Sequence, residues 1–206
     1  QSQVPVLMLT GLDDDDTFTP GRLAALVQYW ALLESTGEQF SGLYTQDIYD
    51  DGHQRTASSK RGSVAWQDLF EFNSVGNQLF TLTSRVRAVG GFDAEMPAWQ
   101  DLDLFMRILK RFGPARLLDA PLYELSVDDR PDRISMSRKA RIVQAFERLA
   151  AKHPDASPRL RQLLFLQVFG RLYGHRPGWA DARRFFMLGW DRRNAARFLG
   201  RVLARA

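Results

Sequence analysis

The sequence contains no cysteine and only three histidines, His53, His153 and His175, among 206 residues. The absence of cysteine excludes disulfides, thiolate nucleophiles and cysteine-ligated zinc, and three widely separated histidines argue against a histidine-rich metal site. No apolar run approaches the roughly 18 residues that a membrane-spanning helix needs. With 45% hydrophobic and 25% charged residues, the composition is not that of a disordered or low-complexity protein. Chemistry in this protein must therefore rely mainly on carboxylates.

Acidic and basic residues are unevenly distributed along the chain. Residues 155–206 contain 11 Arg and three Asp, whereas the formal net charge of the whole chain is only +4, so residues 1–154 carry a net charge of −4. An acidic body followed by an arginine-rich part predicts that the two meet different partners.

The apolar pattern predicts an α/β region followed by a helical one. Val4–Leu9 is typical of a strand buried in a parallel sheet, and Thr19-Pro20 of a helix start with Thr at the N-cap. We expect residues 1–136 to form a partial Rossmann-like sheet with flanking helices, and residues 137–206 a helical, basic region. Further strands are expected at 42–49, 78–82 and 122–127, a loop at 54–62, and helices at 68–72, 100–111, 138–152, 158–173, 178–188 and 191–205.

The most conspicuous polar feature is the acidic run TGLDDDDTF at residues 10–18. Its carboxylates follow the first predicted strand, at the sheet end where α/β proteins bind ligands, and a hard cation such as Mn²⁺ or Mg²⁺ would relieve their mutual repulsion. Three interpretations remain open from this run alone. It is a solvated loop, a DxD motif holding a metal on a sugar-nucleotide diphosphate, or a DxDxT motif of haloacid-dehalogenase-like phosphatases with Asp13 as nucleophile.

A second segment favours the DxD interpretation. VGNQLFTLTSRVRAVGGFDAEMPAWQDLDLFMRILKRFG, at residues 75–113, resembles the acceptor side of inverting, GT-A-type family 2 glycosyltransferases. In that family a GGFD turn precedes a helix that begins with an acidic pair and continues with an apolar face. GLDDDDTFTPGRL resembles the family's DxD region, in the same order, and the resemblance extends from about residue 7 to residue 153. It implies a GT-A fold and an inverting glycosyltransferase.

The resemblance also implies roles for individual residues and partners. Asp13 and Asp15 would hold Mn²⁺ or Mg²⁺, and Asp101 would be the general base. The implied partners are a nucleotide-sugar donor and a glycan or lipid-linked acceptor in bacterial surface polysaccharide synthesis, in the cytoplasm or peripheral on the inner face of the cell membrane. The implied donor- or acceptor-binding residues are Asp14, Asn77, Gln78, Trp99, Gln100 and Arg133.

Helical geometry independently supports Asp101. At 100° per residue it lies on the face of Phe105 and Ile108, and Asp103 lies nearly opposite. Burial should raise the pKa of Asp101 and the helix N-terminus should lower it, a balance that suits a general base toward an alcohol. The alternative is a carboxylate that only caps the helix.

Structural roles also compete for the other candidates. Asn77 and Gln78 could make strand-edge hydrogen bonds, and Trp99 could pack in a core. The sequence departs from the family at Gln100, where a Glu is usual. It also lacks the family's His upstream of DRPDRIS. Two interpretations of this stretch stay open: Asp128 or Asp129 replaces the His as a metal ligand and Arg133 clamps the diphosphate, or the stretch is a plain surface loop.

Arginines alternate with aromatic and aliphatic residues at 183–205. As helices, this segment would present a basic amphipathic surface suited to anionic lipid headgroups, or would pack its apolar face on the domain. Nucleic-acid binding is disfavoured because the rest of the chain is acidic and carries no recognition motif.

The chain begins one strand before the acidic run, so we expect the family's usual nucleotide-binding strands to be missing from this sequence. An alternative to an enzyme is therefore a non-catalytic fragment that binds glycan or membrane.

Overall fold

The computed structural model describes residues 7–50, 54–126, 139–170 and 173–203. The chain divides into two compact units. We call Gln1–Trp66, Asn73–Asp93 and Asp101–Asp129 the α/β unit, and Gln67–Phe72, Ala94–Gln100 and Arg130–Ala206 the helical unit. The predicted division at residues 136 and 137 stays a prediction.

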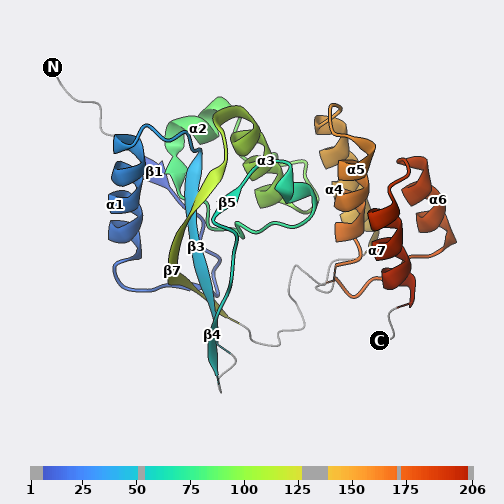
Figure 1. Ribbon diagram of the computed structural model, residues 1–206, viewed down its shortest axis with the longest axis horizontal. Coiled ribbons are helices and arrows are strands. Elements are labelled where there is room, and N and C mark those ends of the chain that lie inside the picture. The colour runs from blue at the N-terminus through green and yellow to red at the C-terminus, as the bar shows by residue number, and fades with distance from the viewer. Residues whose placement is uncertain (1–6, 51–53, 127–138, 171–172, 204–206) are drawn as a thin grey trace. The chain divides into compact units, whose positions relative to one another are not determined.

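The α/β unit is a mixed sheet with flanking helices, which confirms the predicted fold class. Its strands pair in the order β2-β7-β3-β4, with β5 also paired to β7; β3 and β7 run parallel and the other pairs of this sheet are antiparallel. Figure 1 shows α1 on one side of the β3–β7 pair and α3 on the other. The elements are β1 (Met8–Leu9), β2 (Thr17–Phe18), α1 (Arg22–Ser35), β3 (Gly42–Asp50), β4 (Arg55–Ala57), β5 (Ser63–Val64), β6 (Thr81–Leu82), α2 (Thr83–Ala88), α3 (Gln100–Phe112) and β7 (Ala115–Ser126).

An apolar cluster attaches α1 to the strands. Leu26, Trp30 and Leu33, spaced three or four residues apart, form the buried face of the helix. They pack with Phe40, Leu43 and Phe80, and the Trp30 and Phe40 rings meet edge to face with centroids 4.6 Å apart. This cluster fixes the helix that follows the acidic run.

The helical unit is built around a chain of phenylalanines. Phe165 contacts both Phe146 and Phe169, with ring centroids 5.0 and 5.4 Å apart, and Phe198 stacks on Phe185 at 4.5 Å. The helical elements of this unit among the described residues are η1 (Asp68–Phe70), a 3-10 helix, and α4 (Lys139–Lys152), α5 (Pro158–Gln167), α6 (Trp179–Met187) and α7 (Arg192–Leu203). Figure 1 labels the four α-helices. None of the helices in the described part of the chain has the length and hydropathy needed to span a membrane.

Several local predictions were wrong. β1 pairs antiparallel with β6 instead of entering a parallel sheet, and both of its residues are half-buried. Thr19 does not cap α1: its hydroxyl donates to the Leu122 carbonyl, and Gly21, at φ 82°, precedes the helix. The expected loop at 54–62 contains β4, the short helix α2 was not predicted, and β7 starts seven residues earlier than expected.

Candidate active site

The acidic run folds into a compact carboxylate cluster. Asp13, Asp15 and Asp16 each offer an oxygen, and these oxygens all lie within 4.8 Å of one another. A turn brings them together, with the Asp16 amide donating to the Asp13 carbonyl at 3.2 Å. Asp14 is exposed and outside the cluster. Asp16 was missed as a member because the DxD pattern stops one residue before it.

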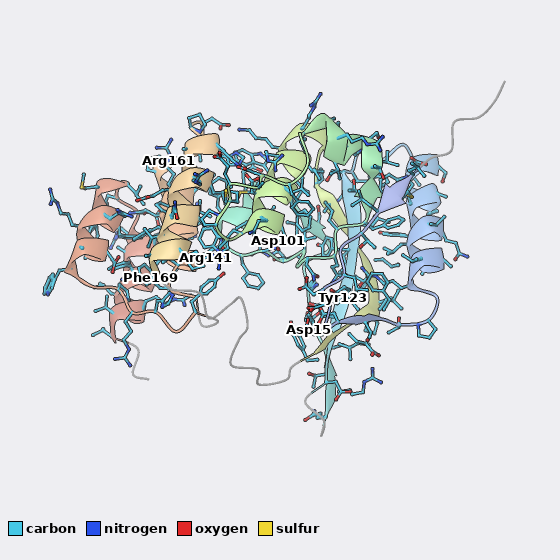
Figure 2. All side chains as sticks on the ribbon, turned by 180° about the vertical axis from the view of Figure 1, so that it is seen from behind. Asp15, Asp101, Tyr123, Arg141, Arg161 and Phe169 are labelled. Carbon is cyan, nitrogen blue, oxygen red and sulfur yellow. The ribbon has the colours of Figure 1, made fainter. Side chains whose placement is uncertain are left out.

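Tyr123 of β7 forms hydrogen bonds with two residues of this cluster. Its hydroxyl donates to Asp16 Oδ2 at 2.7 Å and accepts from the Asp13 amide at 3.4 Å. Burial, together with the hydrogen bond to Asp16, raises the pKa of Tyr123 well above its ordinary value, so the hydroxyl stays a donor. Figure 2 shows Asp15 beside Tyr123 at one end of the sheet. No local motif predicts a role for Tyr123 in this site, because Tyr123 lies more than a hundred residues from the cluster in sequence.

Arg22, the first residue of α1, adds a buried positive charge beside Tyr123. Its guanidinium lies 4.7 Å from the Phe18 ring centroid and 5.1 Å from that of Tyr123. It donates to Gln78 Oε1 at 2.8 Å and to the Thr45 hydroxyl. Burial lowers the pKa of Arg22 to about 10, which still leaves it charged at neutral pH. Arg22 is not among the site residues predicted from the sequence.

Gln78 is 1% exposed and lies within the same buried network. Its Oε1 accepts from Arg22 and from Thr45, and its Nε2 donates to Asp47. Asp47 in turn pairs with Lys60 Nζ at 2.6 Å, a lysine whose pKa burial lowers. The Gln78 amide is therefore engaged with protein, and any effect on a ligand has to pass through these neighbours.

The segment 76–78 is pressed against the loop that leads into the acidic cluster. Thr10 Oγ1 donates to the Gln78 carbonyl at 3.0 Å. At Gly11 an added Cβ would lie 1.9 Å from the Asn77 carbonyl oxygen, so only glycine fits there. Asn77 is half-buried, and its side chain acts on Tyr123 to lower the pKa of that hydroxyl, opposing burial. Asn77 therefore belongs to the surroundings of the cluster.

Asp101 stands in the first turn of α3 and is partly exposed. Asn73 Nδ2 donates to its Oδ2 at 3.0 Å. Burial raises the pKa of Asp101; the backbone amides of Leu102 and of Asp101 itself oppose this, and the negative charge of Asp13 adds to it. The two opposing effects expected from the sequence are both present, and burial prevails. The charge of Asp13 therefore links Asp101 electrostatically to the carboxylate cluster.

Asp103 has a different task. It is fully buried and pairs with Arg107 Nη2 at 2.6 Å. Arg107 also donates to the carbonyls of Val89 and Gly91. The pair therefore ties α3 to the glycine turn that precedes it, consistent with the expectation that Asp103 and Asp101 point in opposite directions.

Two predicted binding residues belong to the helical unit. Trp99 is 8% exposed, and its Nε1 donates to the Tyr173 hydroxyl at 2.8 Å. It is the non-glycine residue with positive φ, 61°, within the described chain. Gln100 donates from Nε2 to the Met96 carbonyl at 3.1 Å. Arg133, Asp128 and Asp129 lie outside the described residues.

Comparison with known proteins adds sequence and fold relatives. No family model matches the chain. It is 26% identical over 176 residues to the "Putative colanic acid biosynthesis glycosyl transferase WcaA" of Escherichia coli (strain K12), covering 83% of this chain and 61% of that protein. A crystal structure of S. aureus TarS 1–349 matches with a TM-score of 0.53 at 13% identity, covering 98% of this chain and 58% of that one. The chain thus spans about three-fifths of each protein.

The chain is related to the family 2 glycosyltransferases of GT-A fold. The resemblance predicted from the two ordered motifs is confirmed, and so is the α/β architecture that it implies. The structure contains a DxD-like acidic triad, Asp13, Asp15 and Asp16.

Proposed function

We propose that this chain carries the catalytic carboxylates of an inverting glycosyltransferase. It would move a sugar from a nucleotide-sugar donor to a hydroxyl of a glycan or lipid-linked acceptor in bacterial surface polysaccharide synthesis. The observation that carries the proposal is a three-carboxylate cluster in the same unit as Asp101, whose pKa is raised first by burial and further by the charge of Asp13. The name of the E. coli relative supports the polysaccharide context.

Asp13, Asp15 and Asp16 would hold a divalent cation. Their donor atoms are all carboxylate oxygens, the hard ligands that suit Mg²⁺ and Mn²⁺. The chemistry that such a cation supplies when bound is neutralisation of the charge on the diphosphate leaving group. Tyr123 would keep Asp16 oriented through its hydrogen bond of 2.7 Å.

Asp101 is the proposed general base. It would take the proton of the acceptor hydroxyl while that oxygen forms a bond to the anomeric carbon of the donor sugar. The bond between the anomeric carbon and the diphosphate oxygen breaks in the same displacement, and the nucleoside diphosphate leaves with the electron pair. A raised pKa brings the carboxylate closer to the operating pH, where a general base is most effective.

The remaining predicted residues keep supporting roles in this proposal. Asp14 is exposed and available to a ligand, and Asn77 lies by Tyr123. Gln78 would act indirectly, by fixing Arg22 and Asp47. Trp99, Gln100 and Arg133 stay proposals as donor- or acceptor-binding residues.

The phosphatase alternative needs a lysine beside Asp13. Within the α/β unit, Lys60 instead pairs with Asp47, and Lys110 lies over the Trp66 ring with Nζ 4.6 Å from its centroid. Both lysines are committed to other groups, which favours the glycosyltransferase proposal.

The decisive experiment combines binding and turnover. Calorimetric titration with UDP, GDP and dTDP, each with and without Mn²⁺, should show metal-dependent binding to one of them. Asp15→Ala should abolish that binding, whereas Asp14→Ala, which removes a carboxylate outside the cluster, should leave Mn²⁺ affinity intact. With the matching nucleotide-sugars, Asp101→Asn should reduce transfer by about 10³-fold while donor binding persists, and Glu34→Gln on the exposed face of α1 serves as the control.

Three outcomes contradict the proposal. If no nucleotide binds in the presence of Mn²⁺, the non-catalytic alternative is favoured. If Asp101→Asn turns over like the unmodified protein, the base is misassigned. A beryllofluoride adduct on Asp13 would establish the phosphatase instead.

A further inference from the structure

The outer side of α6 carries large apolar side chains in contact with solvent. Trp179 is 94% exposed, Met187 75%, and Trp190, just beyond the helix, 73%. Phe186 is 40% exposed and stacks on Trp190, with ring centroids 5.5 Å apart. By contrast Phe185, the next residue back, is fully buried. The helix therefore buries one aromatic residue and leaves several others in water.

These residues form one continuous surface. Trp179, Arg183 and Met187 follow one another at intervals of four, which places them on one face of a helix, roughly opposite Phe185. We call Trp179, Arg183, Phe186, Met187 and Trp190 the α6 surface. A solvent-facing helix side is normally polar, and a contiguous apolar surface on a folded domain marks an interaction site.

The α6 surface lies in an arginine-rich part of the sequence. Residues 176–203 contain seven Arg and two Asp. Arg184 pairs with Glu147 at 2.8 Å and Arg197 with Glu71 at 2.8 Å. Within the described residues, Arg183, Arg192 and Arg193 make no ion pair; all three are exposed. A shallow depression beside Met187 is lined by Ala180, Arg183, Arg184, Met187 and Leu188.

We propose that the α6 surface docks on an anionic lipid bilayer. Trp is enriched at membrane interfaces because its ring is apolar and its N–H is polar, and helices that bind there combine such residues with Arg. Arg183, Arg192 and Arg193, which make no ion pair with any described residue, complement lipid phosphates and are attracted to a negatively charged leaflet. The three arginines would add nothing to the binding of a wholly apolar protein partner. Charge complementarity therefore favours a negatively charged bilayer as the partner. The proposal stands independently of the proposed glycosyltransferase activity.

Vesicle flotation tests the proposal with the full chain. The protein should float with vesicles that contain 30% phosphatidylglycerol in phosphatidylcholine and remain in solution with pure phosphatidylcholine. Replacing Arg183, Arg192 and Arg193 by Gln should lower the partition coefficient by about fivefold for each arginine. Trp179→Ser should lower it by roughly tenfold, the scale of one buried aromatic side chain. Brominated lipids should quench tryptophan fluorescence less in Trp179→Ser than in the unmodified protein.

A matched control comes from the α/β unit. Arg87→Gln and Phe92→Ser likewise remove an exposed arginine and an exposed aromatic residue, and both should leave the partition coefficient unchanged. Far-UV circular dichroism of every variant verifies that the helices are retained. Equal partition into neutral and anionic vesicles, absence of binding to either, or concentration-dependent self-association that Trp179→Ser abolishes would each overturn the proposal.

Discussion

The α/β unit has sixteen acidic and ten basic residues, whereas the helical unit has eighteen basic and eight acidic ones. The two units also differ in what they bury. The α/β unit encloses polar groups such as Arg22, Gln78 and Asp103, each with hydrogen-bonding or ionic partners. The helical unit encloses mostly apolar side chains, among them the rings of Phe165 and Phe198, and fewer polar ones, such as Gln162 and Asn194.

The interior of the α/β unit positions polar side chains, whereas the interior of the helical unit mainly stabilises the fold. Burying a polar group is costly unless it is paired, so a paired network persists where it positions side chains. In the α/β unit the buried network reaches the carboxylate cluster through Tyr123. Packed aromatic rings stabilise a fold without orienting a reactive group. The interior of the helical unit therefore serves stability, and the binding role proposed for this unit belongs to its charged surface.

The largest stability effect is expected in the aromatic core. Phe198 is 1% exposed and stacks on Phe185, so Phe198→Ala should lower the free energy of unfolding by about 3–5 kcal/mol. Urea denaturation measures it. Leu199→Ala, at a neighbouring residue that is 53% exposed, should change it by less than about 0.5 kcal/mol. Similar losses in both variants would mean that α7 does not pack through Phe198.

A smaller loss of stability is expected from a substitution at Gly11, where the backbone of the acidic loop lies against the backbone of Asn77. Gly11→Ala places a Cβ against the Asn77 carbonyl, which should destabilise the protein by about 1–3 kcal/mol and loosen the acidic loop. Gly62, where a Cβ would meet nothing within 4 Å, supplies the control: Gly62→Ala should be neutral or slightly stabilising. Thermal unfolding of the two variants compares them directly, and equal melting temperatures would refute the close approach.

Tyr123→Phe tests whether the buried network serves the cluster. It removes the donor to Asp16 Oδ2, so we expect a loss of about 1–2 kcal/mol in stability. If the cluster binds Mn²⁺, the affinity should fall roughly tenfold as well, because partners of metal ligands orient them. Calorimetry with MnCl₂ gives the affinity. Tyr29→Phe, on α1, should leave both quantities unchanged, and a normal Mn²⁺ affinity in Tyr123→Phe would separate the network from the site.

The smallest effect is a pH-dependent stabilisation by Asp101→Asn. Because the folded-state pKa of Asp101 is raised, the folded protein binds this proton more tightly than the unfolded chain does. The resulting penalty is absent below the ordinary aspartate pKa of about 3.9, grows as the pH rises toward the folded pKa, and is constant above it. Asp101→Asn should therefore be more stable than the unmodified protein at pH 7.

Denaturation of both proteins from pH 3 to pH 8 measures the difference. It should disappear at the acidic end of the series. A variant less stable than the unmodified protein at pH 7 would mean that the carboxylate stabilises the fold, and Asp101 would then be a helix-capping residue instead.

Local sequence determined much of this protein. Apolar residues three or four apart along α1 and α3, and the serine–proline start of α5, specify helices through short-range geometry and capping. The four consecutive carboxylates and the GGFD turn carry the resemblance to the family, and they are readable from the sequence because each is contiguous in the chain. The sequence also predicted that burial and the helix N-terminus would act on the pKa of Asp101 in opposite directions, but not that burial would prevail.

Contacts between residues that lie far apart in the sequence were decided only by the tertiary structure. Tyr123 reaches Asp16 across 107 residues, and Arg22 reaches Gln78 across 56, so no local pattern announces either pair. Whether β1 pairs parallel or antiparallel depends on which strand lies beside it, not on its own residues. Which aromatic residues of α6 enter the core was likewise decided by packing, because Phe185 and Phe186 are identical in type and opposite in burial.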